Sequence, residues 1–328
     1  MNINQKLAEQ IKNEGIIKFV DTVNTSLDTS VLQVEKEAAF VQAIQAASPM
    51  LDRSRYIRMA SEKKDIDRID MELDLEDGSR NSSTGVISLT DQDPDFTTNE
   101  LDVEKLMAKT QLTYEAVEDN IEQGSLESTI ISLFGRAAGR SLERIFIFGD
   151  TDLTPGANVP SGYPVIDGWI AKADSDQVLD SGDFDDTDIE TVMETMYDAM
   201  DPQYVDESVF YVAKSRESEY RRALKGKDTA LGDTAVTGNN QLYFEGVPVI
   251  VVPALSYPIV NSNFNTNISK EVLFLGRPQN FVHGLKREIM VETDKNITNQ
   301  MYDFVLSLRG DCHYEDETKV VVGRPDTT

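Results

Sequence analysis

The chain has 328 residues, of which 40 % are hydrophobic and 27 % charged, so it can bury a core and is not a disordered polymer. Its formal net charge of −27 argues against tight binding to nucleic acid or anionic lipid, because both need a concentrated basic surface. The single cysteine excludes an intramolecular disulfide framework, and no apolar run is long enough to form a membrane-spanning helix.

The first 50 residues are predicted to be mostly helical. Apolar side chains between Val31 and Ala47 recur at near-helical steps, and Pro49 is expected to end that helix. The N-terminus is polar and lacks the apolar core of a signal peptide, so we expect synthesis in a cytoplasm.

The next segment predicts a long hairpin arm over residues 54–98. Within it, the stretch IDMELDLE (residues 69–76) alternates strictly between apolar and acidic side chains, which is typical of a half-buried strand. A turn-forming cluster follows, and the chain can return antiparallel. A two-stranded arm cannot stabilise itself, so another surface is needed to cover its apolar face. That face carries the predicted assembly residues Ile69, Met71, Leu73 and Leu75.

A further strand, LDVEKLMAKTQLT, leads to an unusually long helix over residues 126–148. At 1.5 Å per residue this helix spans roughly 35 Å, and Gly149 is expected to end it in the left-handed conformation. Small residues on the helix, at Gly135, Ala138 and Gly139, predict close approach of another element. Each glycine costs about 1 kcal/mol of helix propensity relative to alanine, which tight packing can offset.

The remainder mixes strands and helices without regular alternation, which indicates an α+β fold. An amphipathic helix is expected after a cap at Asp185 or Asp186, with one apolar face formed by Ile189, Val192, Met193, Met196 and Met200. A buried strand (SVFYVAK), a charged helix (SRESEYRRALKGKD) and a strand (VPVIVVPAL) follow. The last third reads as strands separated by turns: VLFLG, KREIMVETD, MYDFVLSLRGDCHY and KVVVG.

No catalytic, cofactor-binding or metal site is predicted. Phosphate-binding glycine loops and the nucleophile elbow are absent from the sequence. A catalytic pair of Cys312 with His283 stays open as an alternative to a buried thiol, whereas the adjacent Cys312 and His313 point to opposite faces of a strand. The stretch 180–190 is similar to a calcium loop, but its glycine and final glutamate are misplaced, and an acid-rich helix start explains it.

The order of these elements resembles that of the tailed-phage major capsid proteins with the HK97 fold, from about Val31 to Gly323. Several weak matches carry the resemblance in the right order: KLMAKTQLTYEAVEDN before the long helix, GANVPSGYPVIDGW after it, ESEYRRALKGKDTALG and LYFEGVPVIVVPAL later, and FLGRPQNFVHGLKREIMVETD near the end. No single motif is diagnostic.

The resemblance implies five parts. They are an N-terminal arm (1–53), an extended loop (54–98), a peripheral domain (99–160) with a spine helix (126–148), an axial domain (161–284), and return strands of the peripheral domain with a C-terminal tail (285–328). The long helix would then stiffen a wedge-shaped shell subunit, and neighbouring subunits would cover the hairpin arm.

The function implied is that of a structural protein, not an enzyme: copies assemble into pentamers and hexamers of an icosahedral shell around double-stranded DNA. The shell would enclose that DNA without sequence-specific binding, and the negative charge would keep the DNA from adhering. Expected partners are a separate scaffolding protein, since no long domain precedes the arm, with a portal and a decoration protein; no membrane and no cofactor is expected. The alternatives are an encapsulin-like shell around a cargo enzyme and a metal-dependent hydrolase that uses the acids at 183–188.

Overall fold

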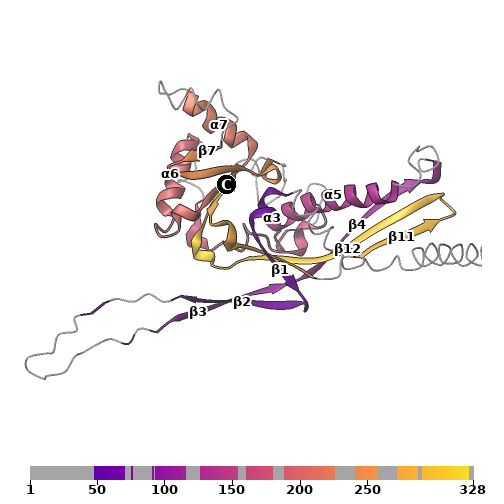
Figure 1. The fold of residues 1–328 in the computed structure, drawn as a ribbon, viewed down its shortest axis with the longest axis horizontal. Coiled ribbons are helices and arrows are strands. Elements are labelled where there is room, and N and C mark those ends of the chain that lie inside the picture. The colour runs from indigo at the N-terminus through magenta and orange to yellow at the C-terminus, as the bar shows by residue number, and fades with distance from the viewer. Residues whose placement is uncertain are drawn as a thin grey trace, which may run out of the picture.

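The computed structural model describes residues 48–70, 75–76, 91, 93–115, 126–153, 160–179, 188–225, 241–256, 272–286 and 290–324. These residues form two sheets, helices packed against them, and a two-stranded hairpin that extends away from the body (Figure 1). The fold is α+β, as the sequence predicts. Among the described residues, no helix combines the length and apolar character needed to cross a bilayer.

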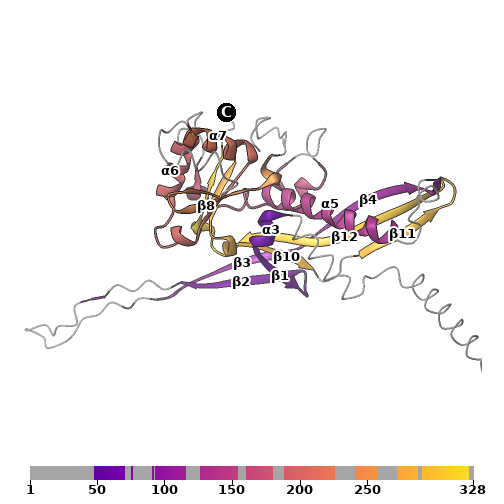
Figure 2. The same cartoon turned by 45° about the horizontal axis from the view of Figure 1, so that its top comes forward.

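The larger layer is a five-stranded sheet with the long helix α5 (Leu126–Phe148) along it (Figures 1 and 2). Its strands are β1 (Arg55–Met59), β10 (Phe281–Lys286), β12 (Met301–Tyr314), β11 (Met290–Asn296) and β4 (Glu104–Thr113). Strand β1 runs parallel to β10, and the other pairs are antiparallel. The long pairing of β4 with β12 gives this part of the molecule its elongated form.

The second layer is a six-stranded sheet covered by α6 (Ile189–Ala199) and α7 (Lys214–Lys225). In sheet order its strands are β5 (Val178–Leu179), β13 (Val320–Gly323), β9 (Leu273–Gly276), β6 (Val209–Val212), β8 (Val247–Val251) and β7 (Leu242–Phe244). The predicted apolar face of α6 is buried, but Asp188 precedes the helix as its cap residue, later than expected. Short 3-10 helices are Tyr163–Val165, Ser175–Gln177, Val205–Glu207, Pro253–Ser256, Pro278–Asn280 and Glu317–Lys319.

One hydrophobic core joins the two sheets, with the ring of Phe281 at its centre. The Phe281 ring packs edge-on against Trp169, Tyr211 and Tyr314, with centroids 5.5, 5.6 and 5.5 Å away. Near the end of the chain, β10 lies in the five-stranded sheet and β13 returns to the six-stranded sheet. After β9 the chain therefore crosses from the six-stranded sheet to the five-stranded sheet and then back again.

Helix α5 has the predicted bounds, but its end has a different cause from the predicted one. Gly149 lies outside the left-handed region; among the described glycines only Gly246 has a positive φ. A Cβ at Gly149 would lie 2.2 Å from the carbonyl oxygen of Ile166. The backbone N–H of Gly168 donates to the Gly149 carbonyl at 2.8 Å, so the chain after the helix folds back tightly onto its end. Glycine is needed here for close packing.

The hairpin consists of β2 (Lys63–Asp70) and β3 (Asp95–Asp102). It therefore begins later than the predicted boundary at Ser54, because β1 joins the main sheet through its parallel pairing with β10. Helix α3 (Pro49–Arg53) precedes β1, and Pro49 begins this helix instead of ending one, since proline fits the first helical turn. The predicted helix before Pro49 lies outside the described residues.

Candidate assembly interface

The hairpin has one face buried against its own subunit. Ile66 on β2 is only 4 % exposed and packs in a small cluster with Leu101 and Val103 beside Met59 and Val282 of the main sheet. This cluster is a minor core of its own at the base of the arm. The base of the hairpin thus belongs to the folded subunit.

The opposite face of the same hairpin is open and apolar at its outer end. Side chains alternate along a strand, so Ile69 points away from the face that holds Ile66. Ile69 lies directly opposite Phe96 on β3, and each side chain is 68 % exposed. Burying such a side chain contributes about 1.5–3 kcal/mol, so this cross-strand pair offers a substantial unburied contact.

Acidic groups follow this apolar pair toward the base of the arm. Asp67 and Asp65 share the strand face of Ile69, and both are exposed. The hydroxyl of Thr98 donates to Asp67 Oδ1 at 3.1 Å, and Lys63 pairs with Glu100 at 2.7 Å. The outward face therefore presents an apolar end and an acidic flank.

Polar contacts along the described strands hold the arm against its own subunit. Arg68 Nη1 lies 2.6 Å from Asp316 Oδ2, and the amide of Asn99 donates to the carbonyl oxygen of Tyr314 at 3.0 Å. The backbone N–H of Asp102 donates to Asp311 Oδ2 at 2.9 Å. Burial raises the pKa of Asp311, and the ammonium of Lys172, 3.0 Å away, opposes that shift. The arm is thus tied to the end of β12 and the residues after it.

The structure describes two of the four predicted assembly residues, Ile69 and Leu75. Ile69 is exposed at the outer end of β2, and Leu75 is 99 % exposed and lies outside any described strand. Met71 and Leu73 lie outside the described residues. Phe96 was not predicted; a lone aromatic residue before the polar run TTNE is the only signal that the sequence offered.

The predicted spine residues lie where α5 meets the body. Gly135 and Gly139 are buried, and Ala138 is half-buried against the main core. Farther along the helix, Glu143 is buried and its Oε1 accepts the backbone N–H of Met50 at 2.9 Å. Burial raises the pKa of Glu143 to about 7, although the backbone N–H groups of Met50 and Leu51 oppose the shift. Glu143 thus joins the long helix to α3.

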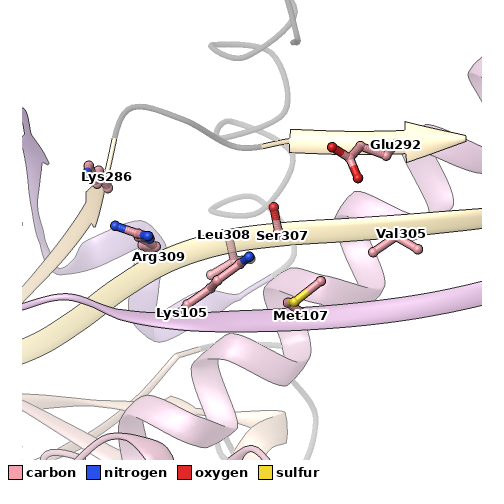
Figure 3. A pocket seen from close by; sticks show the side chains of 8 residues that line it. All are labelled: Lys105, Met107, Lys286, Glu292, Val305, Ser307, Leu308 and Arg309. Atoms are coloured by element: carbon pink, nitrogen blue, oxygen red, sulfur yellow. The ribbon is translucent and has the colours of Figure 1, made fainter. Parts of the chain in front are cut away.

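A cavity of about 250 Å³ lies on the five-stranded sheet (Figure 3). Its lining residues are Lys105, Met107, Lys286, Glu292, Val305, Ser307, Leu308 and Arg309. Lys286 and Arg309 lie close together, whereas Glu292 is farther along on β11 (Figure 3). The carboxylate of Glu62 pairs with both cations, and the hydrogen bond from Arg309 is the main cause of its lowered pKa.

Cys312 and His283 do not form a catalytic pair. They are direct cross-strand partners, but both are buried, so no substrate reaches them. Burial raises the pKa of Cys312 well above its usual value and lowers that of His283 to about 4, so both stay neutral near pH 7. The Nδ1 atom of His283 is hydrogen-bonded to the hydroxyl of Ser54 at 2.8 Å. The two side chains are parts of the core.

Within the described ranges, no group of three histidine, cysteine or acidic residues is arranged to hold a metal ion. Most of the acidic stretch at 180–190 that resembled a calcium loop lies outside those ranges. The acidic cluster at 183–188 that the hydrolase alternative would use also lies outside those ranges, except for Asp188, the residue before α6.

Comparisons with known proteins agree with the arrangement of these elements. The model of the phage capsid family matches residues 30–324. A curated relative from Bacillus subtilis (strain 168), named "Putative prophage capsid protein YqbE", is 26 % identical over 317 residues, which cover 94 % of this chain and 97 % of the relative.

Solved capsid structures share the fold at low sequence identity. The satellite phage P4 procapsid structure, which includes the size determination (Sid) protein, matches with a TM-score of 0.64 and 12 % identity over 96 % of this chain and 99 % of the other. The capsid of a native GTA particle matches with a TM-score of 0.58 and 14 % identity over 85 % and 90 % of the two chains. The structure of Microbacterium phage Oxtober96 matches with a TM-score of 0.55 and 16 % identity over 85 % of this chain and 91 % of the other. None of these findings favours an encapsulin or a hydrolase. The chain therefore belongs to the phage capsid family and is a major capsid protein of a tailed phage.

Proposed function

We propose that the β2–β3 hairpin is the clamp that joins neighbouring subunits within the pentamers and hexamers of an icosahedral shell. Membership of the capsid family makes the chain a virion component whose copies assemble into shells. The exposed pair Ile69 and Phe96, on an arm that an ion pair of Arg68 holds to its own subunit, is the observation that carries the proposal. In a shell, a neighbouring copy would cover this pair.

The two sheets correspond to the two domains of such a subunit. We assign the five-stranded sheet and α5, the spine helix, to the peripheral domain, and the six-stranded sheet with α6 and α7 to the axial domain. Gly135, Ala138 and Gly139 would let the spine lie close to the body, and their burial supports this role. The shared core around Phe281 would make the two domains move as one wedge.

The contents and partners of the shell extend the same proposal. The shell encloses double-stranded DNA, and a net charge of −27 per copy limits adhesion of that DNA to the protein. Because the similar P4 procapsid structure includes a size determination protein, we propose that a separate scaffolding protein directs assembly in the host cytoplasm. A portal and a decoration protein complete the expected set of partners.

Two substitutions on one strand test the clamp. Ile69→Asp should leave the subunit folded and prevent or weaken shell formation, because Ile69 is open in the single subunit. Ile66→Asp is the matched control: it buries a charge in the cluster beside Met59 and should unfold or aggregate the subunit. Thermal melting of the unassembled subunit and electron microscopy of shells measure the two effects.

The result that contradicts the clamp is a clear one. If Ile69→Asp forms shells with wild-type yield and stability, neighbouring subunits do not cover this face. If it destabilises the unassembled subunit as much as Ile66→Asp does, the outer part of the arm belongs to the core.

A further inference from the structure

The cavity on the five-stranded sheet lies where one edge of β12 is left without a strand partner. On that edge β12 pairs with β11 as far as Ser307 and with β10 from Gly310. Between the two ladders, Leu308 and Arg309 have no strand partner on this edge among the described residues. Leu308 packs into the main core, and side chains alternate along a strand, so Ser307 and Arg309 point to the other face. The interruption of the ladders therefore leaves a hollow on the sheet face away from that core.

Three cations from three different strands line this hollow. They are Lys105 on β4, Lys286 at the end of β10 and Arg309 on β12. Lys105 lies directly opposite Arg309 in the pairing of β4 with β12, so both side chains stand on the same face of the sheet. The one acid of the lining, Glu292, lies farther along on β11 (Figure 3). Like charges at such close quarters repel one another, so an anion among them is favoured.

The carboxylate of Glu62 already binds two of these cations. Its Oε1 lies 3.5 Å from Lys286 Nζ and 2.5 Å from Arg309 Nη1, so both donors are aimed at one oxygen atom. This geometry shows that the two side chains are placed to hold an oxyanion. The Glu62 side chain is 62 % exposed, however, and it is not part of the cavity lining. Ion pairs so open to water are weak, so an oxyanion of higher charge can displace this carboxylate.

The cavity has both room and donors for such an ion. The side chain of Lys105 has no acidic partner in the part of the chain that the structure describes. The hydroxyl of Ser307 adds a neutral donor to the same lining. A volume of about 250 Å³ exceeds the space of several water molecules and is ample for a phosphate ion. The several oxygens of phosphate can accept from a guanidinium and two ammonium groups at once, whereas Glu62 offers a single oxygen to two cations.

We propose that Lys105, Lys286 and Arg309 form a binding site for a free phosphate-type oxyanion, and that Glu62 is its internal competitor. In the anion-free subunit the Glu62 carboxylate occupies two of the cations. When phosphate enters, this carboxylate turns out to solvent and Lys105 gains a partner. A small ion is favoured over the DNA backbone because a chain with a net charge of −27 repels a polyanion at long range, whereas a small ion reaches the local cations. The inference goes beyond the assembly function and does not depend on the clamp.

Equilibrium dialysis of the full-length chain against radiolabelled inorganic phosphate, at constant ionic strength, tests the site. The wild type should show saturable binding of a single phosphate per chain. Arg309→Met with Lys286→Met should weaken this binding about tenfold or more, because it removes two charged donors. Lys105→Met should weaken it about threefold, since one exposed ammonium contributes less. An affinity that Lys105→Met leaves unchanged would contradict a site of three cations.

Glu62→Gln gives the sharpest test, because a purely structural ion pair does not predict its result. The change keeps the shape of the side chain and removes the competing charge, so phosphate should bind about threefold to tenfold more tightly. The backbone at this position should stay in place, because the carbonyl oxygen of Glu62 accepts the N–H of Val103 at 3.0 Å. Thermal melting close to wild type would verify that. This variant decides the question even if the double methionine variant fails to fold.

Two substitutions on α7 are the matched controls. Glu219 pairs with Arg216 at 2.9 Å and its side chain is 43 % exposed, so Glu219→Gln makes the same change of net charge in another exposed ion pair. Arg222→Met removes an exposed cation from the same helix. Neither change should alter the affinity for phosphate.

The remaining outcomes overturn the inference. If neither the wild type nor Glu62→Gln binds phosphate in a saturable way, the cations serve only to hold Glu62. If Glu219→Gln tightens binding as much as Glu62→Gln does, the effect is one of net charge and the site does not exist. A short DNA duplex that displaces the labelled phosphate from the wild type, and does not bind the double methionine variant, would assign the cations to the DNA backbone and refute the choice of a free ion.

Discussion

Arg68 on the hairpin and Asp316 near the end of the chain form an ion pair with a distance of 2.6 Å. Their side chains are only 21 % and 9 % exposed, although Arg68 lies on an arm that extends into solvent. Asp316 also accepts the backbone N–H of Thr318 at 3.0 Å, and its own N–H donates to Asn280 at 2.8 Å. The direction of the arm is therefore set by its own subunit before any neighbour arrives.

Arg68→Met should loosen the arm with a moderate cost to the subunit. The change removes one partner of a partly buried pair, so we expect a loss of about 1–3 kcal/mol of unfolding free energy, between the values for exposed and buried pairs. Shell yield should fall further, since the arm must be aimed at a neighbour. Urea unfolding and sedimentation measure the two quantities.

Arg55→Met is the control for that experiment. Arg55 pairs with the adjacent Glu315 at 3.0 Å, but their side chains are 43 % and 38 % exposed. Its loss should cost less than about 1 kcal/mol and leave shells intact. Equal effects of the two substitutions on shell yield would show that the Arg68 pair does not direct the arm.

Gly149→Ala should strongly destabilise the subunit. The new Cβ would lie 2.2 Å from the Ile166 carbonyl oxygen and 2.6 Å from that of Ile145, and both are backbone atoms that cannot rotate away. We expect a loss of about 3 kcal/mol or more, at the upper end of overpacking costs. At Gly162 the nearest atom to a new Cβ is the side-chain Cδ1 of Ile145, at 3.1 Å, so Gly162→Ala should be mild. Similar melting temperatures for both variants would refute the close-packing explanation of the helix end.

The sequence predicted elements whose pattern is local. The apolar face of α6 and the bounds of α5 follow from helical periodicity, and the structure confirms both. Strand β10 was missed because FVHGLK is buried from Phe281 to Leu285 and does not alternate. Residues distant in sequence explain why position 284 is a glycine: a Cβ there would lie 2.6 Å from Met59 Sδ and 3.2 Å from Leu101 Cδ1. The pairing of β1 with β10 joins residues more than 200 positions apart, which periodicity cannot show.

The candidate interface was predictable to a similar degree. Alternation identified the apolar stripe that begins at Ile69, but nothing local indicates that Phe96 lies opposite it. Nor does helical periodicity indicate that the charged Glu143 of α5 is turned inward and buried. Which face of a helix is buried becomes certain only when the neighbouring elements are in place.

Glu143 should make subunit stability depend on pH. Its folded pKa of about 7 is above the unfolded value of 4.5, so its contribution is full below about pH 4.5 and is lost as pH rises through 7. The difference amounts to roughly 3 kcal/mol. In Glu143→Gln this dependence disappears, so wild type should lose stability relative to the variant between pH 5 and 8.

Urea unfolding of both unassembled proteins across this range measures that difference. The comparison with the variant is needed because His283 and His313, whose pKa values are lowered to about 4, act in the opposite direction. The contribution of these two histidines to subunit stability is lost as the pH falls below 6.5, the pKa of histidine in the unfolded chain. A wild-type-minus-variant difference that is constant with pH would show that Glu143 is not desolvated.

Ala138 and Ala137 on the spine helix should respond differently to enlargement. Ala138 is half-buried against the main core, whereas its neighbour Ala137 is exposed. Ala138→Leu adds three carbon atoms where the helix meets the body and should cost about 1–3 kcal/mol or misdirect assembly. Ala137→Leu adds the same atoms on the open side, where leucine and alanine have similar helix propensities, so its effect on melting should be small. If Ala138→Leu melts like Ala137→Leu and forms normal shells, the small residues of α5 do not mark a packed contact, and the helix is not the rigid spine of the subunit.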